Sequence, residues 1–415
     1  MATIAADQVS YADLYGRWEQ GNWSATAIDF STDRDQWENT FTDLERRSAR
    51  WLYTLFFHGE DSVADNLSPF IDAAPREEQK YFLATQQVDE ARHAVLFARF
   101  MSEVVGAGAD PASSLKATRP ELTWGFQKVF ARLDRMADEL RRDRSRPKLA
   151  QAIALYHLVI EAGLAQPGQH LIEESLKRRD LLPGFREGIG NVSKDEQRHI
   201  AFGVKMIADL AREDSECQPA IEELLREIFP YTAAVLVPPH WDERYVTAFG
   251  FTLEEIYTYG ADALDTRFRA AGLDPLSMRV GLPFDVPPEE RARRGLAMLR
   301  AGYLGGPNGS VKASPEVTAL MFDGLARQLD ARRAGNLSIQ WDFTDTEPWQ
   351  LQVQSGVARV MSGRAERPDL VFRCRLQDWA DVVAGRAEPW RLMLTGKIRP
   401  RGRLLTLLRL PKLLG

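Results

Sequence analysis

Apolar residues recur at intervals of three and four positions through most of the first two thirds of the chain. Three stretches show this spacing most clearly, at 51–56, 84–95 and 153–160. The spacing places apolar side chains on one face of an α-helix, which can pack against other helices. Prolines fall between the stretches and are expected to separate helices. The pattern therefore predicts a bundle of long helices from Asp43 to about residue 275, after an aromatic-rich lead-in at 1–40.

The spacing changes after about residue 275, where prolines and glycines become frequent. The segment GGPNGS at 305–310 has the composition of a linker, and 317–334 returns to helical spacing. Later segments alternate apolar and polar residues, as half-buried β-strands do: 337–343, 349–354 and 370–376. The predicted fold class is mainly α, with a helical domain at 1–285, a helix and linker at 286–312, and a smaller α+β domain at 313–415.

Charge and cysteine content narrow the classes of function. The 415 residues carry 53 Lys and Arg against 59 Asp and Glu, a net charge of −6, so no general basic field exists for nucleic acid. Cys217 and Cys374 lie far apart in sequence and form neither a disulfide framework nor a thiolate metal motif. We find no signal peptide and no run of about 18 apolar residues. These features predict a cytoplasmic protein without a membrane span.

One short motif occurs twice in the helical region. Residues 89–93 read DEARH and residues 195–199 read DEQRH. Each copy follows, by about thirty to thirty-five residues, a glutamate in an otherwise apolar run, Glu60 in the first case and Glu161 in the second. The helical region is therefore predicted to contain two copies of a helix pair, each with the pattern Glu followed by Glu-x-x-His.

This pattern is typical of a site for two metal ions. Residues three apart share a helix face, so each Glu-x-x-His pair directs a carboxylate and an imidazole to one point. Four buried carboxylates would repel one another unless cations offset their charge. Carboxylates with imidazoles and no thiolate suit iron or manganese. The predicted ligands are Glu60, Glu90, His93, Glu161, Glu196 and His199. The alternative is ion pairing on exposed helices.

An aspartate precedes each Glu-x-x-His pair, and metal-bound histidine usually donates its second N–H to a carboxylate. One interpretation is that Asp195 orients His93 and that Asp89 orients His199 across the bundle. The other is that each aspartate pairs with an arginine on its own helix face, and the sequence leaves both open. The remaining histidines are interpreted as core or surface residues: His58, His157, His170 and His240.

The segments that carry these residues resemble the ribonucleotide reductase small-subunit superfamily of ferritin-like di-metal proteins, and more closely its ligand-binding oxidases. The resemblance covers about residues 10–275 and rests on YGRWEQGNWSATAIDF, GEDSV, DEARH, YHLVIEAG and SKDEQRHIAFG. It implies a ferritin-like di-metal helical bundle that holds Fe and Mn, or two Fe, with O2 as co-substrate. It also implies an apolar tunnel for a long-chain fatty acid and a homodimer.

Three positions distinguish the oxidases from the reductase subunits. The reductase subunits usually carry a radical-forming tyrosine one turn after the first ligand histidine, where this chain has Phe97. The oxidases carry a valine and a tyrosine that become joined by an ether cross-link. This chain has Val63 three residues after Glu60, and Tyr156 five residues before Glu161. The resemblance therefore implies a cross-link between Val63 and Tyr156, and the alternative is ordinary core packing.

The last hundred residues resemble a sterol-carrier-protein lipid-binding domain. The motifs are QWDFTD at 340–345, PDLVFRCRLQDWADVVAGRAEPW at 368–390 and LTGKIRPRG at 394–402. That family encloses an apolar tunnel between helices and a sheet. The apolar segment at 404–414, with basic residues before it, is expected to be a helix docked on its own sheet. The alternatives are that it caps the tunnel, touches a membrane surface or packs against the bundle.

Together these features favour an O2-dependent di-metal oxidoreductase that acts on a long-chain lipid, fatty acid or acyl group. The attached domain would bind or present that lipid. An electron donor is expected, although the sequence does not identify it. No organic cofactor is expected. Two alternatives remain: a radical-generating subunit of ribonucleotide reductase, and a non-enzymatic lipid carrier with a structural metal site.

Overall fold

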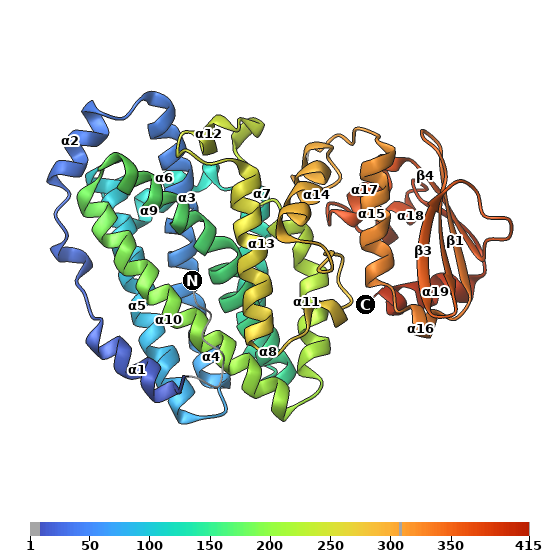
Figure 1. Cartoon of the computed structure of the whole chain (residues 1–415), viewed down its shortest axis with the longest axis horizontal. Helices are drawn as coiled ribbons and strands as arrows, with labels where there is room; N and C mark the ends of the chain where they lie inside the picture. The colour runs from blue at the N-terminus through green and yellow to red at the C-terminus, as the bar shows by residue number, and fades with distance from the viewer. Residues whose placement is uncertain (1–8, 307–308, 415) are drawn as a thin grey trace. The chain divides into compact units, whose positions relative to one another are not determined.

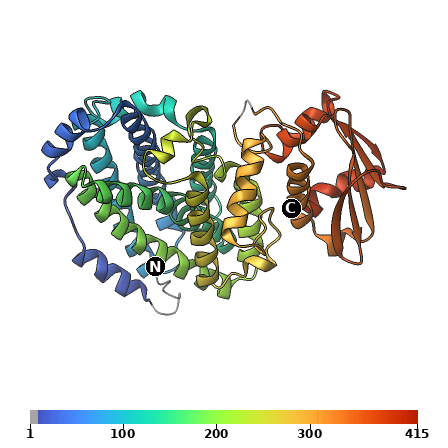
Figure 2. The ribbon, with the colours of Figure 1, turned by 45° about the horizontal axis from the view of Figure 1, so that its top comes forward.

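The computed structural model describes residues 9–306 and 309–414, which form two compact units (Figures 1 and 2). The first unit contains the described residues up to Ile221 together with Pro238–Pro275. The second contains Glu222–Val237 and the described residues from Leu276 onward. The segment Glu222–Val237 therefore lies between the two parts of the first unit in sequence but belongs to the second unit. The periodicity of the sequence does not indicate this assignment. The domain limits expected at 285 and 312 stay predictions.

The first unit is built from helices, which confirms the predicted helical bundle. Its elements are α1 (Tyr11–Gln20), η2 (Ala25–Ala27), α2 (Ser31–Asn39), α3 (Asp43–Asn66), α4 (Ser68–Ala73), α5 (Glu77–Glu103), α6 (Pro111–Thr118), η3 (Arg119–Glu121), α7 (Trp124–Leu140), α8 (Arg146–Ile153), η4 (Ala154–Ala165), α9 (Gln166–Arg179), α10 (Pro183–Glu213), η5 (Pro239–Trp241), α12 (Arg244–Thr247) and α13 (Leu253–Ala270). The chain passes between the units within α11 (Cys217–Thr232) and η6 (Pro275–Ser277).

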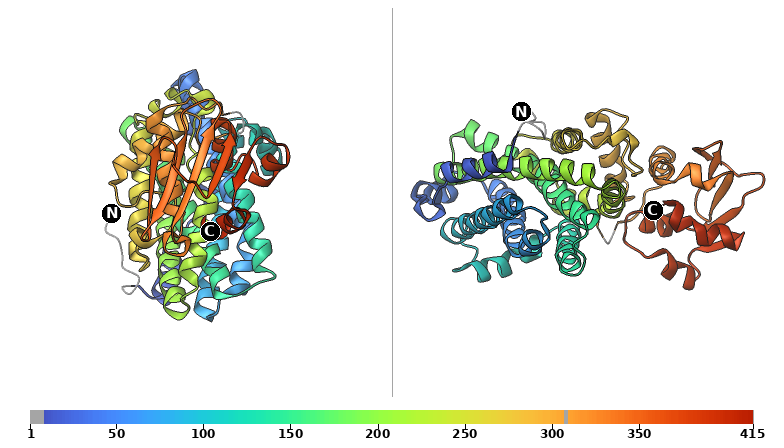
Figure 3. Two further views of the ribbon diagram at one scale, coloured as in Figure 1. Left: turned by 90° about the vertical axis from the view of Figure 1, so that its right-hand side faces the viewer. Right: turned by 90° about the horizontal axis from the view of Figure 1, so that it is seen from below.

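Four helices form the centre of this unit. Helix α3 packs along α5, η4 packs along α10, and α10 also contacts α5 (Figure 3, right). Each of the four carries at least one of the predicted metal ligands on its buried face. Because the predicted ligands lie within these four helices, their side chains are positioned by helical backbone rather than by loops.

The η4 segment is a π-helix that lies between α8 and α9. π-Helical segments are uncommon and frequently occur at functional sites, because the wider turn shifts the direction of side chains. The helical stretch Arg146–Arg179, which contains η4, is the one described stretch long and apolar enough to cross a membrane by length and composition. However, 83% of its most apolar window is buried inside the structure, as expected for a core helix of a bundle.

Two long-range contacts fix α10 in place. Asp33, on α2, accepts hydrogen bonds from the backbone N–H groups of Gly184 and Phe185, at 2.9 and 2.7 Å, and so caps the first turn of α10. Further along α10, Gly203 faces His157 of η4 so closely that a Cβ there would lie 2.2 Å from the histidine Cβ. The absence of a side chain at Gly203 therefore sets the spacing between α10 and η4.

The second unit contains a five-stranded sheet and confirms the predicted smaller α+β domain. Its elements after η6 are α14 (Pro288–Arg300), α15 (Pro315–Gln328), α16 (Ala331–Ala334), β1 (Leu337–Phe343), β2 (Trp349–Gln354), β3 (Val357–Ser362), β4 (Leu370–Cys374), α17 (Leu376–Val383), α18 (Pro389–Leu394), β5 (Arg399–Gly402) and α19 (Leu404–Leu414). The strand order is β3-β2-β1-β4-β5 (Figure 3, left). Only β1 and β4 pair in parallel among these neighbours.

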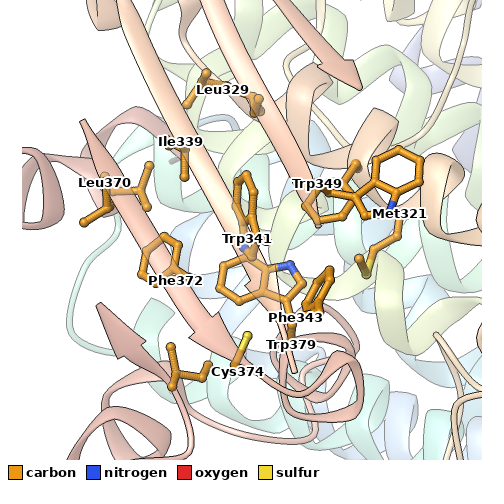
Figure 4. Packing of buried hydrophobic residues seen from close by; sticks show 14 of the residues in the cluster. Met321, Leu329, Ile339, Trp341, Phe343, Trp349, Leu370, Phe372, Cys374 and Trp379 are labelled. Carbon is orange, nitrogen blue, oxygen red and sulfur yellow. The ribbon is translucent and has the colours of Figure 1, made fainter. Parts of the chain in front are cut away.

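One face of this sheet packs against helices in a single apolar core (Figure 4). The core takes alternate residues of β1, β2 and β4 and side chains from α15, α17 and α19. The helix expected at 317–334 is interrupted, because Leu329 adopts an extended backbone and separates α15 from α16. The strand expected at 370–376 ends at Cys374, and α17 begins at Leu376.

The close approach at Gly203 gives a test of the bundle. We expect Gly203→Ala to reduce the free energy of unfolding by about 1–3 kcal/mol, as overpacking of a core usually does. Gly190→Ala is the matched control on the same helix, because nothing lies within 4 Å of the added methyl group. The control should leave stability unchanged or raise it by about 0.5–1 kcal/mol. Denaturant unfolding measures both, and equal stabilities would contradict the proposed role of Gly203.

Candidate metal centre

Six buried side chains from α3, α5, η4 and α10 converge in the interior of the first unit. Two groups of residues can each place one ligand atom per residue within 4.8 Å of the others. The groups are Glu60, Glu90, His93 and Glu196, and Glu90, Glu161, Glu196 and His199. Two members, Glu90 and Glu196, belong to both groups. The structure thus brings together all six residues that the sequence spacing indicated, in an arrangement that can hold two neighbouring metal ions.

Both histidines face the carboxylates through the same ring atom. His93 Nδ1 lies 3.3 Å from Glu60 Oε2 and 3.4 Å from Glu90 Oε2. His199 Nδ1 lies 3.1 Å from Glu90 Oε1. The two imidazoles therefore offer equivalent nitrogen atoms to the two groups of carboxylates.

The opposite ring atom of each histidine binds an aspartate across the bundle. His93 Nε2 donates to Asp195 Oδ2 at 3.2 Å, and His199 Nε2 donates to Asp89 Oδ2 at 3.1 Å. A neutral imidazole that donates through Nε2 keeps its lone pair on Nδ1, where a metal ion can bind. The hydrogen bonds expected from the sequence are present, and their role in orienting metal ligands stays a prediction.

The same aspartates also form ion pairs with arginines, so both interpretations of Asp89 and Asp195 describe real contacts. Arg198 Nη2 lies 2.6 Å from Asp89 Oδ2 and 2.9 Å from Asp195 Oδ1. Arg92 pairs with Asp89 and lies 3.5 Å from Asp195. These two aspartates and two arginines balance in charge, so the ring around the cluster adds no net charge to it.

Two indoles complete the shell around the aspartates. Trp18 Nε1 donates to Asp89 Oδ1 at 2.9 Å, and Trp23 Nε1 donates to Asp195 Oδ2 at 2.8 Å. The Trp23 ring also stacks on His93, with ring centroids 6.2 Å apart. Both tryptophans belong to the aromatic-rich lead-in before α3. The sequence pattern gave no indication that this lead-in contributes to the site. No local spacing connects them to the repeated motif.

Burial and mutual repulsion raise the pKa values of most of the carboxyl groups. Burial raises the pKa of Glu60 and of Glu161 to about 7, and burial together with Glu161 and Glu90 holds that of Glu196 well above its usual value. Burial would also raise the pKa of Glu90, but the His199 and His93 rings hold it well below its usual value. The cluster without cations therefore retains protons at neutral pH.

Several polar atoms at the centre of the cluster have no hydrogen-bond partner among the described residues: Glu161 Oε2, Glu196 Oε2 and His199 Nδ1. Buried polar atoms are almost always paired in proteins, so three such atoms at one point fit a site that binds a cation. The charges agree with this. The four glutamates carry four negative charges when ionised, which two divalent cations would match. The donor set of carboxylates and imidazoles fits iron or manganese.

A glutamine that the sequence spacing did not assign to the site also contacts the carboxylates, and a histidine contacts that glutamine. Gln86 Nε2 donates to Glu161 Oε1 at 2.9 Å and to Glu90 Oε1 at 3.4 Å. His157 Nε2 donates to Gln86 Oε1 at 3.0 Å and so fixes which end of the amide faces the glutamates. Burial lowers the pKa of His157 to about 3, so this ring stays neutral. Gln86 and His157 each lie four residues before a ligand glutamate, a spacing that indicates a shared helix face.

Tyr156 also reaches the cluster. Its hydroxyl donates to Glu90 Oε1 at 2.5 Å, and burial with the surrounding carboxylates raises its pKa well above the usual value. Val63 is buried on α3, three residues after Glu60. The cross-link between Val63 and Tyr156 stays a prediction.

The other positions singled out in the sequence lie in the surrounding core. Phe97 is fully buried and packs against Phe56 and Phe185, each at a centroid distance of 5.8 Å. His58 Nε2 lies 3.0 Å from Thr118 Oγ1, and its pKa is lowered to about 4 by burial. Phe97 and His58 therefore do not belong to either group of potential metal ligands.

Comparison with known proteins relates the two units to different families. A profile of the ribonucleotide reductase small-chain family matches residues 5–237, and one of the SCP-2 sterol transfer family matches residues 319–415. A single-residue variant of the R2-like ligand-binding oxidase, solved with an anaerobically reconstituted Mn/Fe cofactor, is 24% identical with a TM-score of 0.55, over 63% of this chain and 93% of that chain. The R2-like ligand-binding oxidase from Sulfolobus acidocaldarius is 22% identical with a TM-score of 0.54, over 68% and 93%. These solved structures share the ferritin-like fold.

Glu196 gives a direct test of the cluster because it belongs to both groups of potential ligands. We expect Glu196→Ala to lose at least one of two metal ions per chain, since no other carboxylate can replace it without moving a helix. Metal content after loading with Fe(II) and Mn(II) measures this. Glu187→Ala is the control, because Glu187 is an exposed residue of the same helix. Full two-metal occupancy in Glu196→Ala would contradict its assignment.

Metal binding should also depend on pH. The carboxyl groups of Glu60 and Glu161, with pKa values of about 7, are protonated below that pH and must lose their protons before they bind a metal ion. The affinity for Mn(II) should therefore fall by about tenfold or more per pH unit below about pH 7. Calorimetry in buffers of different ionisation heat would also detect the released protons. An affinity independent of pH between 6 and 8 would contradict these pKa values.

Proposed function

This chain belongs to the ribonucleotide reductase small-chain family, and we propose that it is an O2-activating di-metal oxidoreductase that acts on a long-chain lipid. The observation that carries the proposal is the buried cluster of four carboxylates and two histidines, with unpartnered atoms at its centre. The attached second unit matches a sterol transfer family, which supports a lipid as the substrate.

We propose Fe and Mn, or two Fe, as the metal ions. A pair of such ions, when bound, supplies the electrons that reduce O2. The ligands would be Glu60, Glu90, His93, Glu161, Glu196 and His199. The protein's own contribution is to hold the histidine Nδ1 atoms toward the carboxylates, to neutralise the surrounding aspartates with arginines, and to exclude water by burial. The solved R2-like oxidases with Mn/Fe cofactors, which share this fold, support the choice of metals.

Phe97 supports an oxidase rather than a reductase subunit. A benzene ring has no hydroxyl group and cannot carry a phenoxyl radical at this position. The tyrosine that does reach the cluster is Tyr156, whose hydroxyl donates to Glu90. This hydroxyl is thus placed beside the proposed metal ions, where O2 would be reduced. We therefore propose that it reacts with Val63 rather than serving long-range radical transfer.

The partners and the location follow from the same proposal. Reduction of O2 over repeated turnovers needs an electron donor, which this chain is expected to receive from another protein or small molecule. A homodimer and a cytoplasmic location are also expected. A lipid carrier with a purely structural metal site is the outcome that absence of turnover would favour.

Oxygen consumption tests the activity. Anaerobically loaded protein should consume O2 when air is admitted, and Glu196→Ala should not, because it lacks a complete metal pair. Glu187→Ala should behave like the unchanged chain. Lipid extracted before and after exposure should differ in mass if it is the substrate. Full metal occupancy without O2 consumption would contradict the proposed oxidase.

The cross-link gives a second and independent readout. Formation of a bond between the Tyr156 oxygen and a Val63 carbon breaks one O–H and one C–H bond, and O2 accepts the two electrons and two protons. Aerobic loading should therefore join the tryptic peptides 51–76 and 149–177 with a loss of about 2 Da. Tyr156→Phe should give the two peptides unlinked while it retains both metal ions. Unlinked peptides from fully oxidised native protein would favour a different branch of the family.

A further inference from the structure

Helix α19 of the second unit carries leucines on two opposite sides. Leu410 and Leu413 are buried in the core of the unit. Leu404, Leu405 and Leu408 lie on the other side of the helix and are 67%, 76% and 63% exposed. We call these three residues the leucine face. A helix that is apolar on every side is normally covered on every side, by protein or by lipid, so the leucine face lacks the cover that its composition predicts.

The leucine face is the one place in the described second unit where a single helix or strand exposes three large apolar side chains. Exposed apolar residues that occur singly are normal, whereas a group of them marks a contact surface. The other exposed large apolar residues of this unit lie on η6, β3 and α18: Leu276, Val357, Met361, Trp390 and Leu394.

Exposed cations surround the leucine face. Two precede α19, two lie on it, and two lie on α16, which contacts α19 (Figure 1). The sequence contains no Asp or Glu from residue 389 onward. The six cations are Arg401, Arg403, Arg409, Lys412, Arg332 and Arg333.

Acidic side chains offset only part of this charge. Arg403 lies 3.1 Å from Asp369, and Arg333 lies 3.5 Å from Asp330. Asp330 also pairs with Arg279, at 2.7 Å. The region around the leucine face therefore keeps a positive charge, although the whole chain carries a net charge of −6.

Leucines with cations around them fit the surface of an anionic bilayer. The leucines of an interfacial helix enter the boundary of the hydrocarbon, while Lys and Arg side chains extend to the phosphates of the headgroups. Helix α19 has 11 residues, whereas a helix needs about 20 to cross a bilayer. The helix is therefore suited to lie in the plane of a membrane surface and not to span it.

Two other occupants fit this surface less well. A second copy of α19 would bring Arg409 and Lys412 of both chains together, and like charges repel. Stable protein interfaces also use roughly 20–30 residues on each side, far more than this helix exposes. A nucleic acid would pair with the cations but leave the leucines in water. An anionic lipid surface satisfies both the charge and the apolar side chains.

We propose that α19 docks this chain on anionic phospholipid membranes, with the leucine face in the boundary of the hydrocarbon and the surrounding cations on lipid phosphates. The docking is peripheral and reversible. It goes beyond the proposed oxidase and does not depend on the metal centre.

The first test is sedimentation of the full chain with two kinds of vesicle. One kind contains phosphatidylcholine alone, and the other contains equal parts of phosphatidylcholine and phosphatidylglycerol. The chain should bind the mixed vesicles at least about tenfold more tightly, because each Lys or Arg near an anionic surface strengthens binding by about fivefold. Added salt should weaken this binding. Equal binding to both kinds of vesicle, or binding to neither, would overturn the proposal.

Apolar variants test the leucine face itself. Leu405→Glu and Leu408→Glu should each weaken binding to mixed vesicles by about tenfold or more, because they remove an apolar contact and add a repelled charge. Met361→Glu is the control, since Met361 lies on β3, is 41% exposed and undergoes the same change of charge. Equal losses in all three variants would assign the effect to net charge and overturn the proposal.

Charge variants test the cations separately. The double variant Arg401→Gln with Lys412→Gln should weaken binding to mixed vesicles by about tenfold or more and leave binding to phosphatidylcholine unchanged. Lys177→Gln with Lys194→Gln is the matched control, because it removes two exposed cations from the first unit. Equal losses in the two double variants would contradict a local role for the cations around α19.

A fluorescent label measures insertion directly. Cys217 and Cys374 are buried, so a dye sensitive to its environment can be attached selectively to Leu405→Cys. Its emission should shift to shorter wavelength with mixed vesicles, and that of labelled Met361→Cys should not. An unshifted emission from vesicle-bound Leu405→Cys would overturn insertion of the leucine face.

The solution mass without vesicles separates the remaining occupant. If Leu405→Glu converts a dimer to a monomer, the leucine face binds a second copy and the proposal fails. An unchanged mass together with lost vesicle binding supports the membrane. Consumption of O2 is measured without vesicles, so the oxidase proposal can stand or fall independently of this result.

Discussion

Four glutamates buried in one bundle repel one another, and the structure around them limits the cost of that repulsion. The histidine rings point their Nδ1 atoms into the cluster, and the aspartates behind them are balanced by Arg92 and Arg198. The remaining negative charge is therefore confined to the glutamates themselves. Protons or metal ions must occupy the centre of the cluster, and the raised pKa values of Glu60 and Glu161 reflect the first of these states.

Holding these charges together requires closely spaced helices, and several features of the first unit serve that requirement. Gly203 lets α10 approach η4, and Asp33 caps α10 from a distant part of the chain. The π-helical geometry of η4 places Tyr156, His157 and Glu161 in the buried interior together. A metal site built from long helices in this way depends on packing over the whole bundle, and substitutions far from the ligands can affect it.

The ligands could be predicted from the sequence because their geometry is local. A glutamate and a histidine three residues apart share a helix face in any helix, and the motif occurs twice. Gln86 and His157 also lie one turn before ligand glutamates, but polar residues at such spacing are too common to single out. Trp18 and Trp23 could not be predicted as part of the site from local spacing. Their hydrogen bonds to Asp89 and Asp195 join residues that are 71 and 172 positions apart in the sequence. The break at Leu329 likewise depends on packing that helical periodicity does not encode.

In the first unit, the chemistry of the unpartnered buried atoms indicates what can bind there. The first unit has acceptor oxygens and ring nitrogens that face one another, and a cation satisfies all of them. Unpartnered buried polar atoms indicate a binding site only where several of them lie close together. Trp51 and Tyr53 on α3 also have unpartnered polar atoms, but residues two apart point to different sides of a helix and converge on no common ligand. Convergence of several unpartnered groups on one region therefore distinguishes the cluster of glutamates and histidines from isolated buried polar atoms.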